Sequence, residues 1–175
     1  MAINMPIIVL VGLMGAGKSR VGAELAKLLD MPFVDADREI EKAAGMSIPE
    51  IFATYGEQEF RKGEKRVMTR LLSGKPIVLA SGGGAFVQPD IRAAVKEKSV
   101  SVWLKADIET LVSRTKRTQH RPLLQGVDRE AKLQALMDAR YPLYAEADIV
   151  LVTDKQTPQT MARRIRKELV DLGKL

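Results

Sequence analysis

Residues 12–19 form a glycine-rich segment that ends in a lysine and a serine, Gly-Leu-Met-Gly-Ala-Gly-Lys-Ser. Glycines let the backbone curl so that successive N–H groups point at phosphate oxygens, and a following helix adds its positive amino-terminal end. The spacing is that of a phosphate-binding P-loop, in which we expect Lys18 to reach the β- and γ-phosphates and the Ser19 hydroxyl to bind Mg²⁺. The expected ATP contacts in and beside this loop are Gly12, Met14, Gly15, Ala16, Gly17, Lys18, Ser19 and Arg20.

The P-loop alone does not name a reaction, because GTPases, ATPases and small-molecule kinases share it. Two carboxylates that stand one residue apart, Asp35 and Asp37, follow a short apolar segment and narrow the choice. One of them can hold Mg²⁺ through its water, while the other accepts a hydrogen bond from a substrate hydroxyl. The alternative is an Asp-rich turn in which Asp37 caps the next helix.

Arg61 and Glu64 lie three residues apart, so they share a face of a helix. Glu64 also falls on an apolar stripe with Phe60, Val67 and Leu71, where a carboxylate is costly unless it is paired. A pair held at the edge of the core can present a rigid guanidinium fork to a carboxylate ligand. The alternative is an ordinary exposed ion pair.

Three consecutive glycines, Gly82, Gly83 and Gly84, form a third candidate feature, which we call the glycine triplet. Glycines let the backbone approach a ligand closely, although they also suit a flexible turn. The preceding segment ends in Ser81 and carries no acid where P-loop proteins place a second metal-binding residue. Asp35, or Ser81 through a water, must therefore complete the Mg²⁺ shell.

Strands and helices alternate along the chain. Apolar runs predict strands at residues 5–11, 33–35, 76–81, 99–105 and 148–152. Helices are predicted after the P-loop, from the capping-box residues Ser47 and Glu50 to Gly56, over Phe60 to Leu71, and at 88–96, 107–117, 128–140 and 158–172. The pattern favours a single α/β domain over residues 1–175, a three-layer α/β/α fold with a five-stranded parallel sheet. Ligands in such sheets bind at the carboxyl ends of the strands, where the P-loop, the two acids and the glycine triplet all lie.

The amino-acid composition excludes several kinds of site and binding partner. The chain has no cysteine, which excludes a disulfide framework, a thiolate zinc site and a cysteine nucleophile. The net charge is +6, but aromatics make up only 5%, which argues against a nucleic-acid stacking platform. No apolar run approaches the ~20 residues that span a bilayer. We expect a cytoplasmic monomer that binds small molecules and neither nucleic acid nor membrane.

The combined motifs resemble those of the shikimate kinase family over nearly the whole chain. The match rests on the P-loop, the acidic pair, the glycine triplet and three further segments, Glu59-Phe60-Arg61, Arg121-Pro122-Leu123-Leu124 and Arg140-x-Pro-Leu-Tyr144. The resemblance implies a P-loop kinase fold and phosphorylation of the 3-hydroxyl of shikimate by ATP with Mg²⁺, in the pathway to chorismate and aromatic amino acids. Gluconate kinase is the nearer alternative, a nucleoside monophosphate kinase another, and a nucleotide-dependent switch protein the alternative from a different class.

The resemblance also implies a role for each matched residue. Asp37 would bind the ring hydroxyls, Arg61 and Arg140 the substrate carboxylate, and the glycine triplet would contact the substrate through its backbone. Lys18, Asp37 and Arg121 would be the catalytic residues, with Asp37 as base or only as a positioning group. Ser19 and Asp35 would serve the metal, and Arg114 and Pro158 would flank the adenine. Residues 116–127 would form a lid that carries Arg121, and residues 37–64 a substrate-binding helical region.

Overall fold

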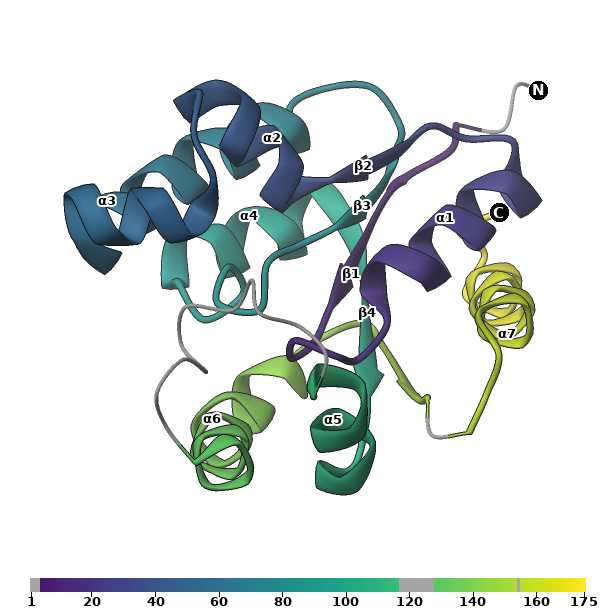
Figure 1. Ribbon diagram of the computed structural model, residues 1–175. Helices are drawn as coiled ribbons and strands as arrows, with labels where there is room; N and C mark the ends of the chain where they lie inside the picture. Colours follow the sequence, from purple (N-terminus) through teal and green to yellow (C-terminus); the bar gives the residue numbers. More distant parts are fainter. Residues whose placement is uncertain (1–3, 117–127, 154) are drawn as a thin grey trace.

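The computed structural model describes residues 4–116, 128–153 and 155–175. A five-stranded parallel sheet forms its centre, in the order β2 (Phe33–Asp35), β3 (Val78–Ala80), β1 (Ile7–Val11), β4 (Ser99–Lys105) and β5 (Ile149–Val152) (Figure 1). The central strands β1 and β3 are buried throughout, as expected of apolar runs that are covered on both faces. The predicted five-stranded α/β fold is therefore confirmed.

Helices cover both faces of the sheet. Helices α1 (Lys18–Leu29) and α7 (Pro158–Asp171) lie side by side on one face, and α4 (Pro89–Lys98) packs on the other (Figure 1). Helix α3 (Ile48–Leu72) packs against α4 and against α2 (Ala36–Ala44). Helices α5 (Ile108–Thr115) and α6 (Arg129–Tyr144) pack against each other beyond the end of β4.

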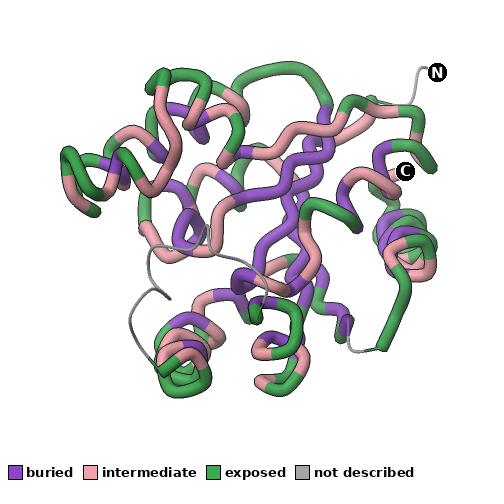
Figure 2. The backbone as a smooth tube through the Cα atoms, in the orientation of Figure 1, coloured by how far each residue is buried: buried purple, intermediate pink, exposed green. Residues whose placement is uncertain are grey.

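Two hydrophobic cores hold these layers. The larger one surrounds the sheet and appears as the buried stretch along the strands (Figure 2). The smaller one joins α2 to α3 through Ile40, Ile51, Phe60 and Val67. The segment that carries the acidic pair and Arg61 therefore has its own core beside the main one. No helix within the described ranges is long and apolar enough to cross a membrane.

The predicted break at Gly56 is confirmed. Both capping-box bonds form between Ser47 and Glu50 at the start of α3, and Gly56 interrupts the helix with φ 84° and ψ 170°. The structure also decides one alternative that the sequence left open and moves one expected helix end. Helix α2 is capped by Asp35, whose Oδ1 accepts a hydrogen bond of 3.0 Å from the Asp37 backbone N–H, so Asp37 is not the cap. Helix α6 runs past residue 140 to Tyr144, because the aromatic packing of its last turn on β4 outweighs the hydrogen bond that Pro142 removes.

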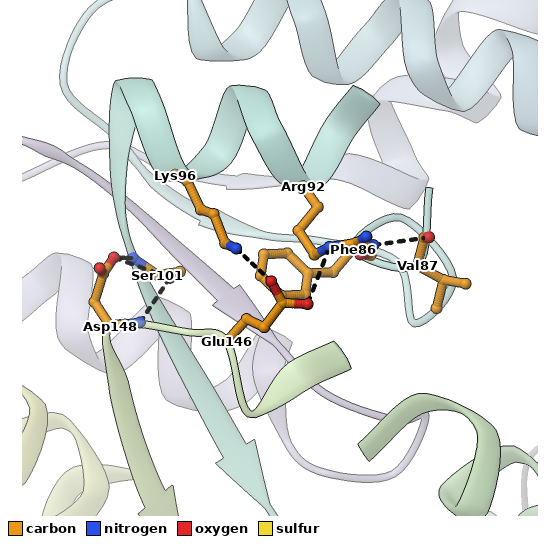
Figure 3. A network of polar contacts seen from close by, with 7 residues as sticks. All are labelled: Phe86, Val87, Arg92, Lys96, Ser101, Glu146 and Asp148. Atoms are coloured by element: carbon orange, nitrogen blue, oxygen red, sulfur yellow. Dashed lines mark hydrogen bonds and ion pairs between the residues drawn. The ribbon is translucent and has the colours of Figure 1, made fainter. Parts of the chain in front are cut away.

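Arg92 of α4 fixes the loop that follows the glycine triplet. Its Nη1 donates to the carbonyl oxygens of Phe86 at 3.1 Å and Val87 at 3.0 Å, and its Nε lies 3.4 Å from Glu146 Oε2 (Figure 3). Lys96 pairs with the same carboxylate. Because Glu146 follows directly after α6, these contacts tie α4, the triplet loop and α6 into one frame.

Asp148 plays a similar role at the edge of the sheet. Its Oδ2 accepts hydrogen bonds from the backbone N–H of Ser101 at 2.8 Å and from the Ser101 hydroxyl at 3.0 Å (Figure 3). These bonds come just before the pairing of Val102 with Ile149, so they set the register of β5 on β4.

Gly22 tests how closely α1 packs on the sheet. A Cβ there would lie 2.6 Å from Phe33 Cε2 and 3.2 Å from Leu10 Cδ1. We expect Gly22→Val to lower the free energy of unfolding by about 1–3 kcal/mol, because the packed interface has no room for the added methyl groups. Gly63→Val is the matched control, since its nearest neighbour is Arg66 Nη2 at 3.8 Å. Urea unfolding that gave the same loss for both variants would contradict this account.

Candidate active site

The P-loop follows β1 and leads into α1 as the sequence predicts. Gly12, Gly15 and Gly17 have φ values of 147°, 85° and 96°, a backbone conformation that favours glycine. Gly17 is the N-cap of α1, and no described side chain caps that helix. The first N–H groups of α1 therefore stay available to an anion, and the helix dipole favours negative charge at this end.

Lys18 and Ser19, which we expect to contact the phosphates and Mg²⁺, are the first two residues of α1. Lys18 Nζ donates to the carbonyl oxygens of Gly12 at 2.7 Å and Leu13 at 3.0 Å, which places the ammonium group against the loop. Ser19 Oγ donates to Asp35 Oδ2 at 2.7 Å, although the two residues are 16 positions apart in the sequence. A hydroxyl and a carboxylate thus meet beside the phosphate loop, as Mg²⁺ requires when it takes few protein ligands and several phosphate or water oxygens.

Ser81, the other residue considered for the metal shell, has a different role. It is buried, and its hydroxyl and backbone N–H both donate to the carbonyl oxygen of Leu10, at 2.8 and 3.1 Å. Ser81 therefore joins the end of β3 to β1. No group of three or more metal-ligating acids or histidines occurs in the part of the chain that is described. The donor set that fits Mg²⁺ is thus Ser19 with Asp35.

Arg114 reaches the P-loop from α5. Its Nη1 donates to the carbonyl oxygens of Gly15 at 3.3 Å and Ala16 at 3.1 Å. Arg20 is exposed in the first turn of α1, and Pro158 opens α7 after β5. The predicted nucleotide contacts thus come from segments that follow β1, β4 and β5, and their roles toward ATP stay predictions.

The glycine triplet is the point where the predicted acceptor residues meet. A Cβ on Gly82 would lie 2.9 Å from Asp37 Oδ1, and one on Gly83 would lie 3.3 Å from Arg140 Nη1. The guanidinium of Arg61 lies directly against Gly84, whose Cβ would come within 2.5 Å of Cζ and 2.6 Å of Nη2. Close approach, and not turn flexibility, is therefore what these glycines provide.

Arg61 and Glu64 form the predicted pair, and it is not an exposed one. Nη1 of Arg61 donates to Glu64 Oε1 at 2.9 Å, and the Glu64 side chain is only 1% exposed. Burial raises the pKa of Glu64, the pairing with Arg61 opposes the rise, and the charge of Asp37 adds to it. Gln88 is a second hydrogen-bond donor to Glu64, and its Nε2 lies 2.8 Å from Glu64 Oε1. Because Gln88 belongs to no motif, the sequence alone gives no reason to expect this contact.

Helix α6 supplies the second arginine of this cluster. Arg140 is buried, with 8% exposure, and Tyr144 one turn later is fully buried. The Tyr144 hydroxyl donates to the carbonyl oxygen of Gly83. Tyr144 belongs to the matched Arg140-x-Pro-Leu-Tyr144 segment, but its contact with the triplet backbone was not anticipated. Arg121 and residues 117–127 of the predicted lid lie outside the described residues.

The two halves of the site adjoin. The Cβ position of Gly83 lies 3.6 Å from the carbonyl oxygen of Gly12 and 3.7 Å from the backbone nitrogen of Met14. The P-loop therefore borders a cluster made of Asp37, Arg61 and Arg140. In a three-layer α/β/α fold, this arrangement defines a P-loop phosphotransferase for a small acceptor.

Comparison with known proteins identifies the family. The family model for shikimate kinase matches residues 14–170. A shikimate kinase of Caulobacter vibrioides is 57% identical over 155 residues, which cover 89% of this chain and 77% of the relative. One of Paramagnetospirillum magneticum is 52% identical over 163 residues, 93% of this chain and 84% of the relative. The chain belongs to the shikimate kinase family.

Solved structures agree with this assignment. The shikimate kinase of Acinetobacter baumannii, solved in complex with shikimate, has a TM-score of 0.95 and 41% identity, and the match covers 97% of this chain and 96% of that one. A gluconokinase of Sinorhizobium meliloti has a TM-score of 0.63 at 20% identity, with 97% and 94% covered. At that identity, the likeness to the gluconokinase concerns the fold alone.

Tyr144 makes a testable contribution to stability at alkaline pH. Burial raises its pKa to about 12, with Arg140 opposing the rise. The unfolded chain releases this proton near pH 10, so the unfolded state binds fewer protons than the native state above that pH, and stability falls as pH rises. We expect Tyr144→Phe to be about 1 kcal/mol less stable at pH 7, because the bond to Gly83 is lost. The wild type should then lose up to about 2–3 kcal/mol over pH 9–12 that Tyr144→Phe does not lose, so the gap should close and then reverse in favour of the variant.

Urea unfolding at a series of pH values checks this expectation. Tyr55→Phe is the control, because the Tyr55 side chain is 59% exposed. Its stability curve should run parallel to that of the wild type. A Tyr144→Phe curve that also ran parallel would show that Tyr144 does not carry the alkaline pH dependence.

Proposed function

We propose that this protein transfers the γ-phosphoryl group of ATP to the 3-hydroxyl of shikimate and releases ADP and shikimate 3-phosphate. The observation that carries the proposal is the convergence of Asp37, Arg61 and Arg140 over the glycine triplet, next to the P-loop. Shikimate is a small anionic triol, so it needs cations for its carboxylate and an acceptor for its hydroxyls. The family assignment and the relative solved with shikimate support the same substrate.

Each side of the acceptor matches one group of the cluster. The guanidinium groups of Arg61 and Arg140 can bind the carboxylate by charge-assisted hydrogen bonds, which are directional and roughly twice as strong as neutral ones. Both arginines are held in place, Arg61 by Glu64 and Arg140 by its burial. Asp37 then accepts a hydrogen bond from a ring hydroxyl on the side that faces the P-loop.

The chemistry needs chiefly positioning and charge stabilisation. The 3-hydroxyl oxygen attacks the γ-phosphorus, the bond from phosphorus to the β–γ bridging oxygen breaks, and the electron pair leaves with ADP. The hydroxyl proton passes to Asp37, or to solvent if Asp37 only orients the hydroxyl. Lys18 and Arg121 stabilise the charge that develops on the phosphoryl oxygens. Ser19 and Asp35 would hold Mg²⁺, which would supply positive charge to offset the negative charge of the phosphates.

The proposal extends to the setting of the enzyme. A single chain supplies both the nucleotide-binding and the acceptor residues, which is consistent with a monomer. Closure of residues 116–127 over the site would bring Arg121 to the phosphates and exclude water as a competing acceptor. With this metabolic role, we expect the enzyme to act in the cytoplasm, on the pathway to chorismate and aromatic amino acids.

An acceptor panel tests the function directly. ADP release is measured with Mg²⁺ and ATP in the presence of shikimate, gluconate, a nucleoside monophosphate or no acceptor. Among these acceptors, we expect only shikimate to support turnover. In Lys18→Met, which keeps the length of the side chain but removes its charge from the phosphates, kcat should fall at least about a hundredfold. Turnover with gluconate and none with shikimate would overturn the proposal in favour of a gluconate kinase. Turnover that needs no acceptor would favour a nucleotide switch protein.

Gly84→Ala tests the assignment of Arg61 to the acceptor. The new methyl group would occupy the place of the Arg61 guanidinium, which is the end of a long side chain and can move without unfolding the protein. We expect the KM for shikimate to rise about tenfold, equivalent to about 1.4 kcal/mol, with the KM for ATP unchanged. Gly63→Ala lies on the same helix as Arg61, and its new methyl group would meet only Arg66 Nη2 at an ordinary contact distance of 3.8 Å, so it should leave both constants unchanged. A rise in the KM for ATP instead would place Arg61 in the nucleotide site.

A further inference from the structure

Gln88 occupies the N-cap position of α4 but does not cap the helix. N-cap positions favour Ser, Thr, Asp or Asn, whose short side chains accept a hydrogen bond from the first turn. The Gln88 side chain makes no such bond, and its Nε2 donates to Glu64 Oε1 at 2.8 Å, 24 positions away in the sequence. A polar side chain at the start of one helix thus holds a buried carboxylate on another.

The same oxygen of Glu64 also accepts the hydrogen bond from Arg61 Nη1, at 2.9 Å. A buried carboxylate stays charged only if donors replace the water it has lost. Two other groups face Glu64, but neither offers a positive charge that would stabilise the carboxylate. Asp37 lies on the other side of Gly82, and Tyr144 comes from α6. Arg140 lies beside Tyr144 and Gly83. Among the described residues, Gln88 is therefore the hydrogen-bond donor to Glu64 that stabilises the carboxylate without carrying a charge of its own.

Arg61 has a second carboxylate within reach. Its Nη2 lies 3.4 Å from Glu57 Oε1, and the Glu57 side chain is 55% exposed. The Glu64 contact holds the guanidinium against Gly84, whereas the Glu57 contact draws it toward solvent. The two contacts use different nitrogens of the guanidinium and exist together, so the position of Arg61 against Gly84 depends on how firmly Glu64 is fixed.

We propose that Gln88 is a positioning residue of the acceptor site, which fixes Glu64 so that Glu64 holds the Arg61 guanidinium over the glycine triplet. The inference rests on the proposed function, in which Arg61 binds the substrate carboxylate. It assigns Gln88 a part in selecting an acceptor that carries a carboxylate, although Gln88 itself need not touch the substrate.

Gln88→Met is the main test, because methionine keeps the length of the side chain and removes the donor. We expect the KM for shikimate to rise about three- to tenfold, with kcat and the KM for ATP within about twofold of wild type. Gln58→Met, an exposed glutamine on α3, is the matched control and should leave all three constants unchanged. Gln88→Asn, which keeps the amide but is one methylene too short to reach Glu64, should behave like Gln88→Met and serves if that variant fails to fold.

A double-mutant cycle separates positioning from a structural effect. Glu64→Gln removes the charge that Gln88 is proposed to hold. In that background, Gln88→Met should change the KM for shikimate by less than about twofold. If the two effects multiply instead, Gln88 acts independently of Glu64 and the inference is wrong.

A readout on the free enzyme distinguishes failure of this inference from failure of the proposed function. NMR titration of the Glu64 carboxyl carbon needs no substrate. We expect Gln88→Met to raise the Glu64 pKa above its wild-type value and to move the acidic limb of the kcat/KM profile for shikimate to higher pH. An unchanged titration would overturn the inference even in an active enzyme. A shifted titration in an enzyme that does not use shikimate would overturn only the substrate assignment.

Discussion

The close approach of side chains to the glycine triplet is the constraint on which the rest of the site depends. Asp37 comes from α2, Arg61 from α3 and Arg140 from α6, and each lies where a Cβ on one of the three glycines would intrude. The same segment adjoins the P-loop through Gly83. A bare backbone at the end of β3 therefore lets three separate elements converge beside the phosphate loop, which is why Arg92, Glu146 and Tyr144 all serve to hold that backbone or its flanks in place.

This arrangement lowers the stability of the protein, because it buries the Glu64 carboxylate. Burial raises its pKa, so the native state resists ionisation more than the unfolded state does, and stability falls as the pH rises through the native pKa. Arg61 and Gln88 oppose this rise in the pKa, because both donate hydrogen bonds that favour the charged carboxylate. A well-packed apolar residue would be no less stable there, and often more so, but it would leave Arg61 with only the exposed Glu57. The buried charge is best understood as a positioning device whose cost the two cores offset.

The sequence predicts the donor half of the site better than the acceptor half, for a physical reason. The P-loop is a local motif whose glycines, lysine and serine act within eight residues. Ser19 and Asp35 were both expected to serve the metal, and their contact agrees with that expectation. Gln88 and its partner Glu64 are 24 positions apart in the sequence, and Tyr144 and its partner Gly83 are 61 apart. Each contact joins single polar groups that have many equally plausible partners in the sequence. The sequence left open whether Asp37 caps α2, because Asp35 and Asp37 have the same capping chemistry and only the backbone geometry identifies Asp35 as the cap.

The acceptor half also differs from the donor half in what holds it. The P-loop is anchored to β1 at the centre of the main core, and Arg114 fastens it from α5. The α2 and α3 helices share a smaller core, and α3 is interrupted at Gly56 just before the segment that carries Arg61. With so little apolar burial of its own, this region depends more on polar contacts to keep its geometry. The proposed nucleotide half is thus held by the main core. The proposed acceptor half depends on a few buried hydrogen bonds, among which those to Glu64 hold the Arg61 guanidinium against the glycine triplet.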